Sequence, residues 1–229
     1  MKQLMLIHGA LGGADQLIPL KDLLKEDFKI HLLEFEGHGK KAAAGSSFSL
    51  ESFEQQFSKA LSKIDEPVHI FGYSMGGFIA LLHTANDNKQ IYSITTLGTK
   101  MKWSQVIAEK ETKNLNAAVI AEKVPWFAEA LKKRHGDYWQ DVMKRTADFM
   151  KELGEIQPVQ ESAMKKIEIP VQSCLAENDA MVSIAETQQV QKWMTNCTLE
   201  IIPESKHPIE QVDLMALANT IRSFVQSLD

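Results

Sequence analysis

The amino-acid sequence predicts an α/β fold, built on a mainly parallel six-stranded sheet with helices on both faces. Short apolar runs alternate along the chain with longer segments in which apolar residues recur three and four positions apart. This alternation is typical of a parallel sheet with crossover helices. The connections are short except between the fourth and fifth apolar runs, where about 70 residues intervene. We therefore expect a helical subdomain to be inserted after the fourth strand.

Six short apolar runs are the predicted strands, because such runs are typical of strands buried within a parallel sheet. In chain order they are Gln3–Ile7, Lys29–Leu33, Val68–Phe71, Ile91–Leu97, Val171–Leu175 and Leu199–Ile202. Segments of helical period lie between and after them. The predicted helices are Gln16–Lys25, Leu50–Ile64, Gly76–Ala85, Ile184–Trp193 and Ile209–Leu228.

The predicted insertion, a helical cap over residues 100–166, divides an α/β core into residues 1–99 and 167–229. It carries 13 Lys+Arg and 10 Asp+Glu in a chain whose net charge is -5, and it holds three of the four tryptophans. One interpretation is a helical excursion with solvated lysine faces and its aromatic residues packed underneath. The other is a lid whose aromatic underside lines a pocket over the strand ends, and both can hold at once.

The composition of this 229-residue chain excludes several classes of protein. A net charge of -5 gives no basic footprint for nucleic acid or an anionic membrane surface, so we expect neither partner. No run approaches the ~20 apolar residues of a membrane span, and the N-terminal apolar run lacks a signal-peptide pattern, so we expect a cytoplasmic protein. Cys174 and Cys197 are expected to be reduced core residues.

The strongest chemical signal is the segment V-H-I-F-G-Y-S-M-G-G-F-I-A-L-L. Its G-x-S-x-G pattern, between an apolar strand and an apolar helix, places Ser74 in a sharp strand-to-helix turn. Gly72 and Gly76 are expected to be small because neighbouring backbone approaches closely. The N–H of Met75, at the start of the helix, would face developing negative charge. Ser74 is thus a candidate nucleophile; the alternative is a bystander serine in a glycine-rich turn.

A serine nucleophile needs a base, and in this architecture the chain order is Ser, then an acid, then His. Of the histidines after Ser74, His83 lies within the following helix. His135, in K-K-R-H-G-D, is interpreted as an exposed helix end. His207, in I-I-P-E-S-K-H-P-I-E, follows the last strand and is expected to open the last helix. His207 is therefore the candidate base.

Two acids end the preceding strand in P-V-Q-S-C-L-A-E-N-D-A-M-V. Glu177 follows the strand immediately, whereas Asp179 reaches the loop. In an extended chain two residues this far apart point to opposite sides, so only one can face His207. Asp179 is the preferred candidate, and Glu177 is the alternative.

The loop after the first strand, L-M-L-I-H-G-A-L-G-G, is expected to supply the second half of an oxyanion hole. Gly9 allows a tight turn that leaves the N–H of Ala10 available, with Leu11 as the alternative donor. A dinucleotide-binding fingerprint is excluded, because Leu11 stands where G-x-G-x-x-G requires its second glycine.

Together the motifs H-G-A-L-G-G, E-F-E-G-H-G, G-Y-S-M-G-G, E-N-D-A-M-V and S-K-H-P resemble the α/β-hydrolase fold superfamily over essentially the whole chain. The resemblance implies a catalytic triad of Ser74, Asp179 and His207, oxyanion donors at Ala10 and Met75, and a cap at about 100–166. The sequence starts at the His-Gly strand, so the extra antiparallel strands common at the family's N-terminus are expected to be missing. Two motifs depart from the family pattern: E-F-E-G-H-G-K-K replaces D-x-P-G-H-G-x-S, and Lys206 replaces the glycine before the histidine.

Within the superfamily, the serine at the turn excludes the branches that use aspartate there. The menaquinone-pathway synthase branch carries Arg after G-Y-S-x-G-G, where this chain has Phe78, so an apolar pocket wall is expected. The predicted pocket residues are Leu11, Phe78, Trp103, Trp126, Phe127 and Trp139.

The expected function is hydrolysis of a small carboxylic ester or thioester through an acyl-enzyme, with no metal and no organic cofactor. The partner is then a small-molecule substrate. Hydrolysis of a C–C bond, or acyl transfer to an acceptor other than water, would use the same residues. A further alternative is a ligand-sensing protein with slow turnover, in which the cap is the moving part.

Overall fold

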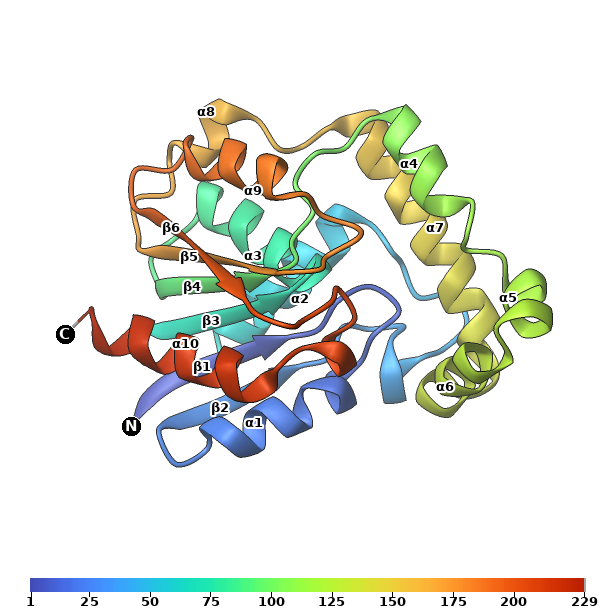
Figure 1. The fold of residues 1–229 in the computed structure, drawn as a ribbon, viewed down its shortest axis with the longest axis horizontal. Coiled ribbons are helices and arrows are strands. Elements are labelled where there is room, and N and C mark those ends of the chain that lie inside the picture. Colours follow the sequence, from blue (N-terminus) through green and yellow to red (C-terminus); the bar gives the residue numbers. More distant parts are fainter. Residues whose placement is uncertain (229) are drawn as a thin grey trace.

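The computed structural model describes residues 1–228 and contains one six-stranded sheet (Figure 1). The strands are β1 (Lys2–Ile7), β2 (Phe28–Leu33), β3 (Val68–Tyr73), β4 (Ile91–Leu97), β5 (Val171–Ala176) and β6 (Cys197–Ile202). Their order is β2-β1-β3-β4-β5-β6, and all five pairings are parallel. The predicted strands are confirmed, with ends that differ by at most two residues.

Helices cover both faces of the sheet, as predicted. Met5 and Ile7 of β1 face one hydrophobic cluster, whereas Leu4 and Leu6 face the other, which is the period of two expected of a strand. The first cluster contains buried residues of α2 (Leu50–Leu61), α3 (Met75–Asn86) and α9 (Ile184–Gln191). The second contains those of α1 (Ile18–Leu24) and α10 (Leu214–Gln226). Figure 1 shows these helices on opposite sides of the strands.

The last helix begins later than predicted. Ile209–Gln211 form a separate 3₁₀ turn, η4, and α10 starts at Leu214. The Asp213 carboxylate accepts hydrogen bonds from the N–H groups of Met215 and Ala216, which caps the new helix at this point. His207 therefore lies in a loop and does not open a helix. A similar turn, η1 (Ala14–Leu17), precedes α1.

Between β4 and β5 the chain forms α4 (Gln105–Thr112), α5 (Ala117–Lys123), α6 (Pro125–His135), the 3₁₀ turn η3 (Gly136–Tyr138), α7 (Trp139–Ile156) and α8 (Glu161–Met164). Helices α4 to α7 lie beyond the carboxyl ends of the strands (Figure 1). Phe149 and Leu153 of α7, and Met164 after them, belong to the core of the sheet. A smaller cluster around Leu131 joins α5, α6 and the start of α7. The division into core and cap remains a prediction.

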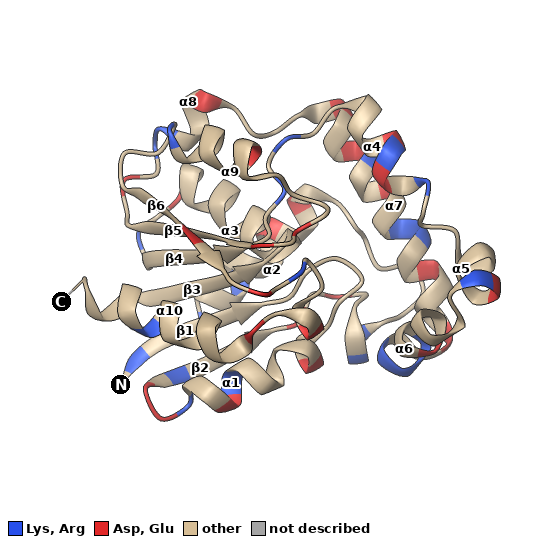
Figure 2. Ribbon diagram, viewed as in Figure 1, with Lys and Arg blue, Asp and Glu red and all other residues tan. Residues whose placement is uncertain are grey.

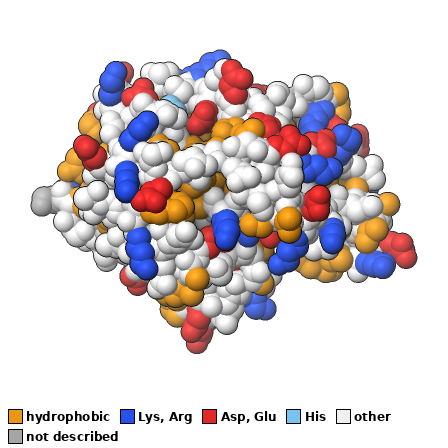
Figure 3. Space-filling view, turned by 90° about the horizontal axis from the view of Figure 1, so that it is seen from above, with side chains coloured by type: hydrophobic (Ala, Val, Ile, Leu, Met, Phe, Trp, Pro, Cys, Tyr) orange, Lys and Arg blue, Asp and Glu red, His pale blue; other side chains and the backbone are white. Residues whose placement is uncertain are grey.

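Charged residues of both signs are interspersed along the inserted helices (Figure 2) and over the face seen from above (Figure 3). Within residues 1–228, no helix has the length and apolar character needed to cross a bilayer. Both cysteines are free thiols, and Cys174 is buried as expected, but Cys197 is only half-buried at the start of the edge strand β6.

Candidate active site

Ser74 lies between the end of β3 and the start of α3, in a backbone conformation of φ 49° and ψ -112°. A positive φ is unusual for a residue with a side chain and lets the strand turn sharply into the helix. A Cβ on Gly72 would lie 2.4 Å from the backbone of Gly77, and one on Gly76 would lie 2.6 Å from the Ile7 carbonyl oxygen. The two glycines of the motif are thus required by close backbone approach, as predicted.

The loop after β1 runs beside this serine. A Cβ built on Gly9 would lie 3.1 Å from the Ser74 Cβ and 2.9 Å from the ring of Tyr73. Met75 is the first residue of α3, so its N–H has no acceptor within the helix. The N–H of Ala10 donates to no backbone acceptor within residues 1–228. Two unused amide donors, those of Ala10 and Met75, therefore belong to the two segments that meet at Ser74.

His207 and Asp179 form a buried pair. The Nδ1 atom of His207 lies 2.8 Å from Asp179 Oδ2, and the two side chains are 9% and 1% exposed. The other carboxylate oxygen accepts the N–H groups of Met181 and Val182, each at 2.8 Å. Burial raises the pKa of Asp179, but the hydrogen bonds and the nearby imidazole outweigh it and lower the pKa below 3.8. The carboxylate is therefore ionised and acts as the acceptor of an Nδ1–H.

Glu177 has a different partner. Its carboxylate accepts the N–H of Glu204 at 2.8 Å, and its side chain is exposed. The strand ends at Ala176, and a turn closed by the Asp179 N–H and the Ala176 carbonyl brings Asp179 toward His207. The geometry thus pairs His207 with Asp179, the preferred candidate.

Two residues that sequence reasoning did not single out adjoin this pair. The buried hydroxyl of Tyr73 donates to the His207 carbonyl oxygen at 3.0 Å. Gly98 follows β4 with φ 57°, and a Cβ there would lie 3.1 Å from both Asp179 Oδ2 and His207 Nδ1. The glycine at the end of a predicted strand was the available signal, although sequence alone does not show that it faces the histidine.

The three candidate residues follow β3, β5 and β6 at the carboxyl edge of the sheet. Within residues 1–228 no hydrogen bond joins the Ser74 hydroxyl to His207. Such contacts in unliganded enzymes often shorten only when substrate binds. The described residues contain no cluster of three or more His, Cys, Asp or Glu side chains suited to a metal ion.

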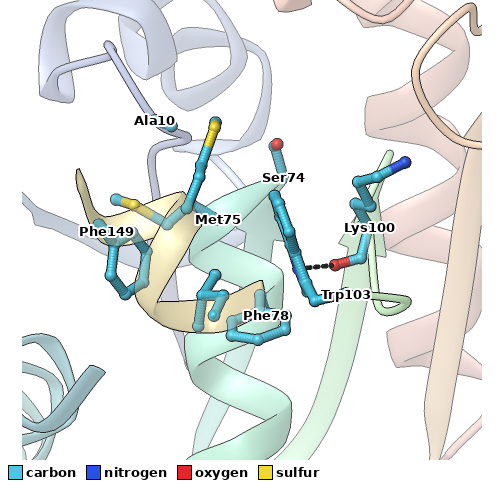
Figure 4. Close-up of a pocket in the computed structure, with 9 residues that line it drawn as sticks. Ala10, Ser74, Met75, Phe78, Lys100, Trp103 and Phe149 are labelled. Atoms are coloured by element: carbon cyan, nitrogen blue, oxygen red, sulfur yellow. Dashed lines mark hydrogen bonds between the residues drawn. The ribbon is translucent and has the colours of Figure 1, made fainter. Parts of the chain in front are cut away.

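A small apolar cavity opens at Ser74 (Figure 4). Its volume is about 40 Å³, and it is lined by Ala10, Ser74, Met75, Phe78, Lys100, Trp103, Phe149, Met150 and Leu153. Phe78 and Trp103 were predicted pocket residues. The Trp103 indole N–H donates to the Lys100 carbonyl at 3.2 Å, which fixes the ring against the cavity. The α7 residues were missed because helical period shows that a face is buried but does not identify what it covers.

The other four predicted pocket residues do not line this cavity. Trp126 is 70% exposed on α6. Leu11, Phe127 and Trp139 pack against the small cluster of α5, α6 and α7. For Phe127 and Trp139 the structure matches the first of the two interpretations, in which the aromatic residues of the insertion are packed underneath it.

His135 is not the exposed helix end that its charged sequence context indicates. It is 2% exposed, with Nδ1 2.9 Å from the Gly39 N–H and Nε2 3.0 Å from the Leu11 carbonyl oxygen. The lysines beside it face solvent, whereas the helix turns this one ring inward. His8 and His38, whose rings lie 5.0 Å apart, are also fully buried next to it.

Three comparisons with known proteins bear on the family and the fold. The family model of the alpha/beta hydrolase fold matches residues 2–142. A pimeloyl-[acyl-carrier protein] methyl ester esterase from Aliivibrio salmonicida (strain LFI1238) is 26% identical over 130 residues, which are 56% of this chain and 45% of that protein. The chain therefore matches less than half the length of this relative.

Among solved structures, a thermophilic esterase from Thermogutta terrifontis superposes with a TM-score of 0.78 at 14% identity, covering 100% of this chain and 90% of that one. NosK from Streptomyces actuosus superposes with a TM-score of 0.79 at 15% identity, covering 99% of this chain and 98% of that one. At these identities the likeness shows a shared fold.

Proposed function

The chain belongs to the alpha/beta hydrolase fold family, and from this premise we propose that it is a serine hydrolase that cleaves small carboxylic esters or thioesters. The observation that carries the proposal is the position of Ser74. It stands in a strained turn at an apolar cavity, between two unused backbone donors, and the His207–Asp179 pair lies at the same edge of the sheet.

In the proposed reaction, Ser74 Oγ attacks the carbonyl carbon of the substrate while His207 Nε2 accepts the hydroxyl proton. The N–H groups of Ala10 and Met75 stabilise the negative charge on the carbonyl oxygen. Asp179 holds the imidazole with its proton on Nδ1 and stabilises the imidazolium. His207 then protonates the leaving alcohol or thiol, and a water molecule activated by the same nitrogen releases the acid from the acyl-enzyme.

The cavity favours a small acyl group. A volume of about 40 Å³ is about three times the ~10–15 Å³ that a cavity needs to hold one water molecule, so a short chain fits and a longer one requires movement of the walls. The lining is almost entirely apolar: Phe78 supplies no charge for an acidic acyl group, and the ammonium of Lys100 is paired with Glu111 at 3.4 Å. The ester chemistry named for the Aliivibrio relative supports the reaction class.

The test is a fluorophosphonate probe combined with nitrophenyl esters and acyl-thioesters of increasing chain length. We expect one label per chain, at Ser74, and turnover of about 1–1000 per second on the shortest acyl groups. Ser74→Ala should abolish both and change the Tm by only a few degrees, because the side chain is small and its hydroxyl makes no hydrogen bond within residues 1–228. Labelling of the Ala variant would overturn the assignment. Slow turnover with a large ligand-induced rise in Tm would favour the ligand-sensing alternative.

A further inference from the structure

The end of α6 ties the insertion to the loop that carries Ala10. His135, the last residue of this helix, reaches two loops of the sheet at once: Gly39 after β2 and Leu11 after β1. The ring is buried, so water does not compete for either hydrogen bond. No other side chain of the insertion makes a hydrogen bond to the segment Gly9–Gly12 within residues 1–228 except the neighbouring Arg134.

The two partners determine the tautomer of His135. The Gly39 N–H can only donate, so Nδ1 must be unprotonated, and the Leu11 carbonyl can only accept, so Nε2 must carry the proton. Both ring nitrogens are thereby satisfied by backbone groups. The neutral imidazole acts as a rigid link of defined length between the two loops.

The backbone conformation of Leu11 requires support from its surroundings. Its φ is 57°, in a turn closed by the Gly12 N–H and the Gly9 carbonyl at 3.1 Å, where the position with positive φ favours glycine or asparagine. A strained conformation persists only where its surroundings hold it. The Leu11 side chain packs on the small cluster of the insertion, and its carbonyl accepts hydrogen bonds from His135 and Arg134. The insertion thus stabilises this turn from both sides of the residue.

Arg134 extends the same connection. Its guanidinium, 12% exposed, pairs with Asp15 at 3.1 Å and with Glu210 at 3.2 Å. Asp15 lies in η1, just after the turn, and Glu210 lies in η4, three residues after His207. One helix end therefore contacts the segments on both sides of the candidate site.

We propose that His135 is a positioning residue for the oxyanion hole: by anchoring the Leu11 carbonyl, it holds the Gly9–Gly12 turn so that the Ala10 N–H faces the reacting oxygen. The proposal rests on the proposed function, because it assigns a use to the donor at Ala10. It means that the inserted helices complete the oxyanion hole as well as shaping a pocket. His135 itself does not touch the substrate.

The activity test compares His135→Ala with His135→Gln. The glutamine amide carries an acceptor and a donor side by side and can replace both hydrogen bonds. We expect His135→Ala to lower kcat by about 10- to 100-fold on the best nitrophenyl ester, somewhat less than the ~10²–10³ lost with a whole oxyanion donor, while KM changes less than about threefold. His135→Gln should recover kcat to within about threefold of the parent. His69→Gln is the matched control, since His69 is buried and hydrogen-bonded to Ser93 on the sheet.

A second measurement does not depend on turnover. Amide hydrogen exchange followed by mass spectrometry should show faster exchange across residues 9–13 in His135→Ala, with the strands as protected as in the parent. Unchanged exchange in that segment would overturn the proposal. The proposal would also be overturned if His135→Ala and His135→Gln lost kcat equally and in proportion to their loss of stability. If the parent chain hydrolyses no ester, the proposed function fails, and the effect of His135 on kcat cannot be assigned. The exchange data would still decide whether His135 holds the Gly9–Gly12 turn.

Discussion

The carboxyl edge of the sheet and the inserted helices are held in place by different means. Ser74 directly follows β3 and Asp179 comes three residues after the end of β5, and backbone hydrogen bonds to Leu97 and Ala176 fix where each chain segment turns. The insertion instead contacts the core through side chains, among them Phe149 and Leu153 of α7, Met164 of α8 and His135 at the end of α6. The candidate catalytic residues thus lie where the geometry follows from strand pairing, whereas part of the cavity wall belongs to helices that side-chain packing holds in place.

The largest effect should come from the carboxylate at the sheet edge. Asp179→Asn removes the charge that orients His207, and by analogy with the ~10⁴ loss in a serine protease we expect kcat to fall on the order of 10³ or more. Glu177→Gln should cost less than about tenfold, because within residues 1–228 the only hydrogen bond to that exposed carboxylate comes from the Glu204 N–H. Steady-state kinetics on one ester, with urea unfolding of both variants, gives the comparison. The opposite ranking would move the acid to Glu177.

The free energy of unfolding should depend on pH through the buried histidines at the junction between the two regions. Burial lowers the pKa of His8 from 6.5 to about 4, and burial also lowers those of His38 and His135. The folded state therefore disfavours a proton that the unfolded chain binds below pH 6.5. The free energy of unfolding is therefore highest above pH 6.5 and falls as the pH drops toward 4. For His8 alone this loss is roughly 3 kcal/mol.

Urea unfolding between pH 7.5 and 4.5 measures this loss. The carboxylate of Asp179, whose pKa lies below 3.8, does not titrate in that window. His8→Gln should flatten the curve, because the amide carries no titratable proton, even if the variant is less stable at every pH. A free energy of unfolding that is constant across the range would contradict the burial of neutral imidazoles at this junction.

The smallest effect is expected on substrate selectivity, when two tryptophans of the insertion are compared. Trp103→Ala enlarges the cavity beside Ser74, so kcat/KM for longer acyl chains should rise relative to acetate by about tenfold, in line with ~1–3 kcal/mol per methylene. Trp126→Ala removes an exposed ring and should leave the ratios within about twofold. Profiles of kcat/KM against chain length decide the point. Unchanged profiles in both variants would mean that neither ring contacts the substrate.

Much of the molecule could be predicted from sequence because the signals are local. Each strand contains a short apolar run, although the edge strands β2 and β6 also carry exposed residues, and all six were found within two residues of their ends. The turn at Ser74 is also local, because its glycines are required by contacts within a few residues and by the adjacent strand. Chain order then indicated Asp179 and His207, which the structure pairs at 2.8 Å.

Contacts between segments far apart in the chain became evident only from the three-dimensional structure. The sequence predicts a helical insertion that holds Trp126 and Phe127, but only the packing of its helices puts Phe149 of α7 at the cavity and leaves Trp126 of α6 in solvent. His135 stands among lysines and was expected to be exposed, yet a loop 124 residues earlier supplies its partner. Such contacts depend on how whole elements pack, and no pattern within one segment of the sequence encodes them.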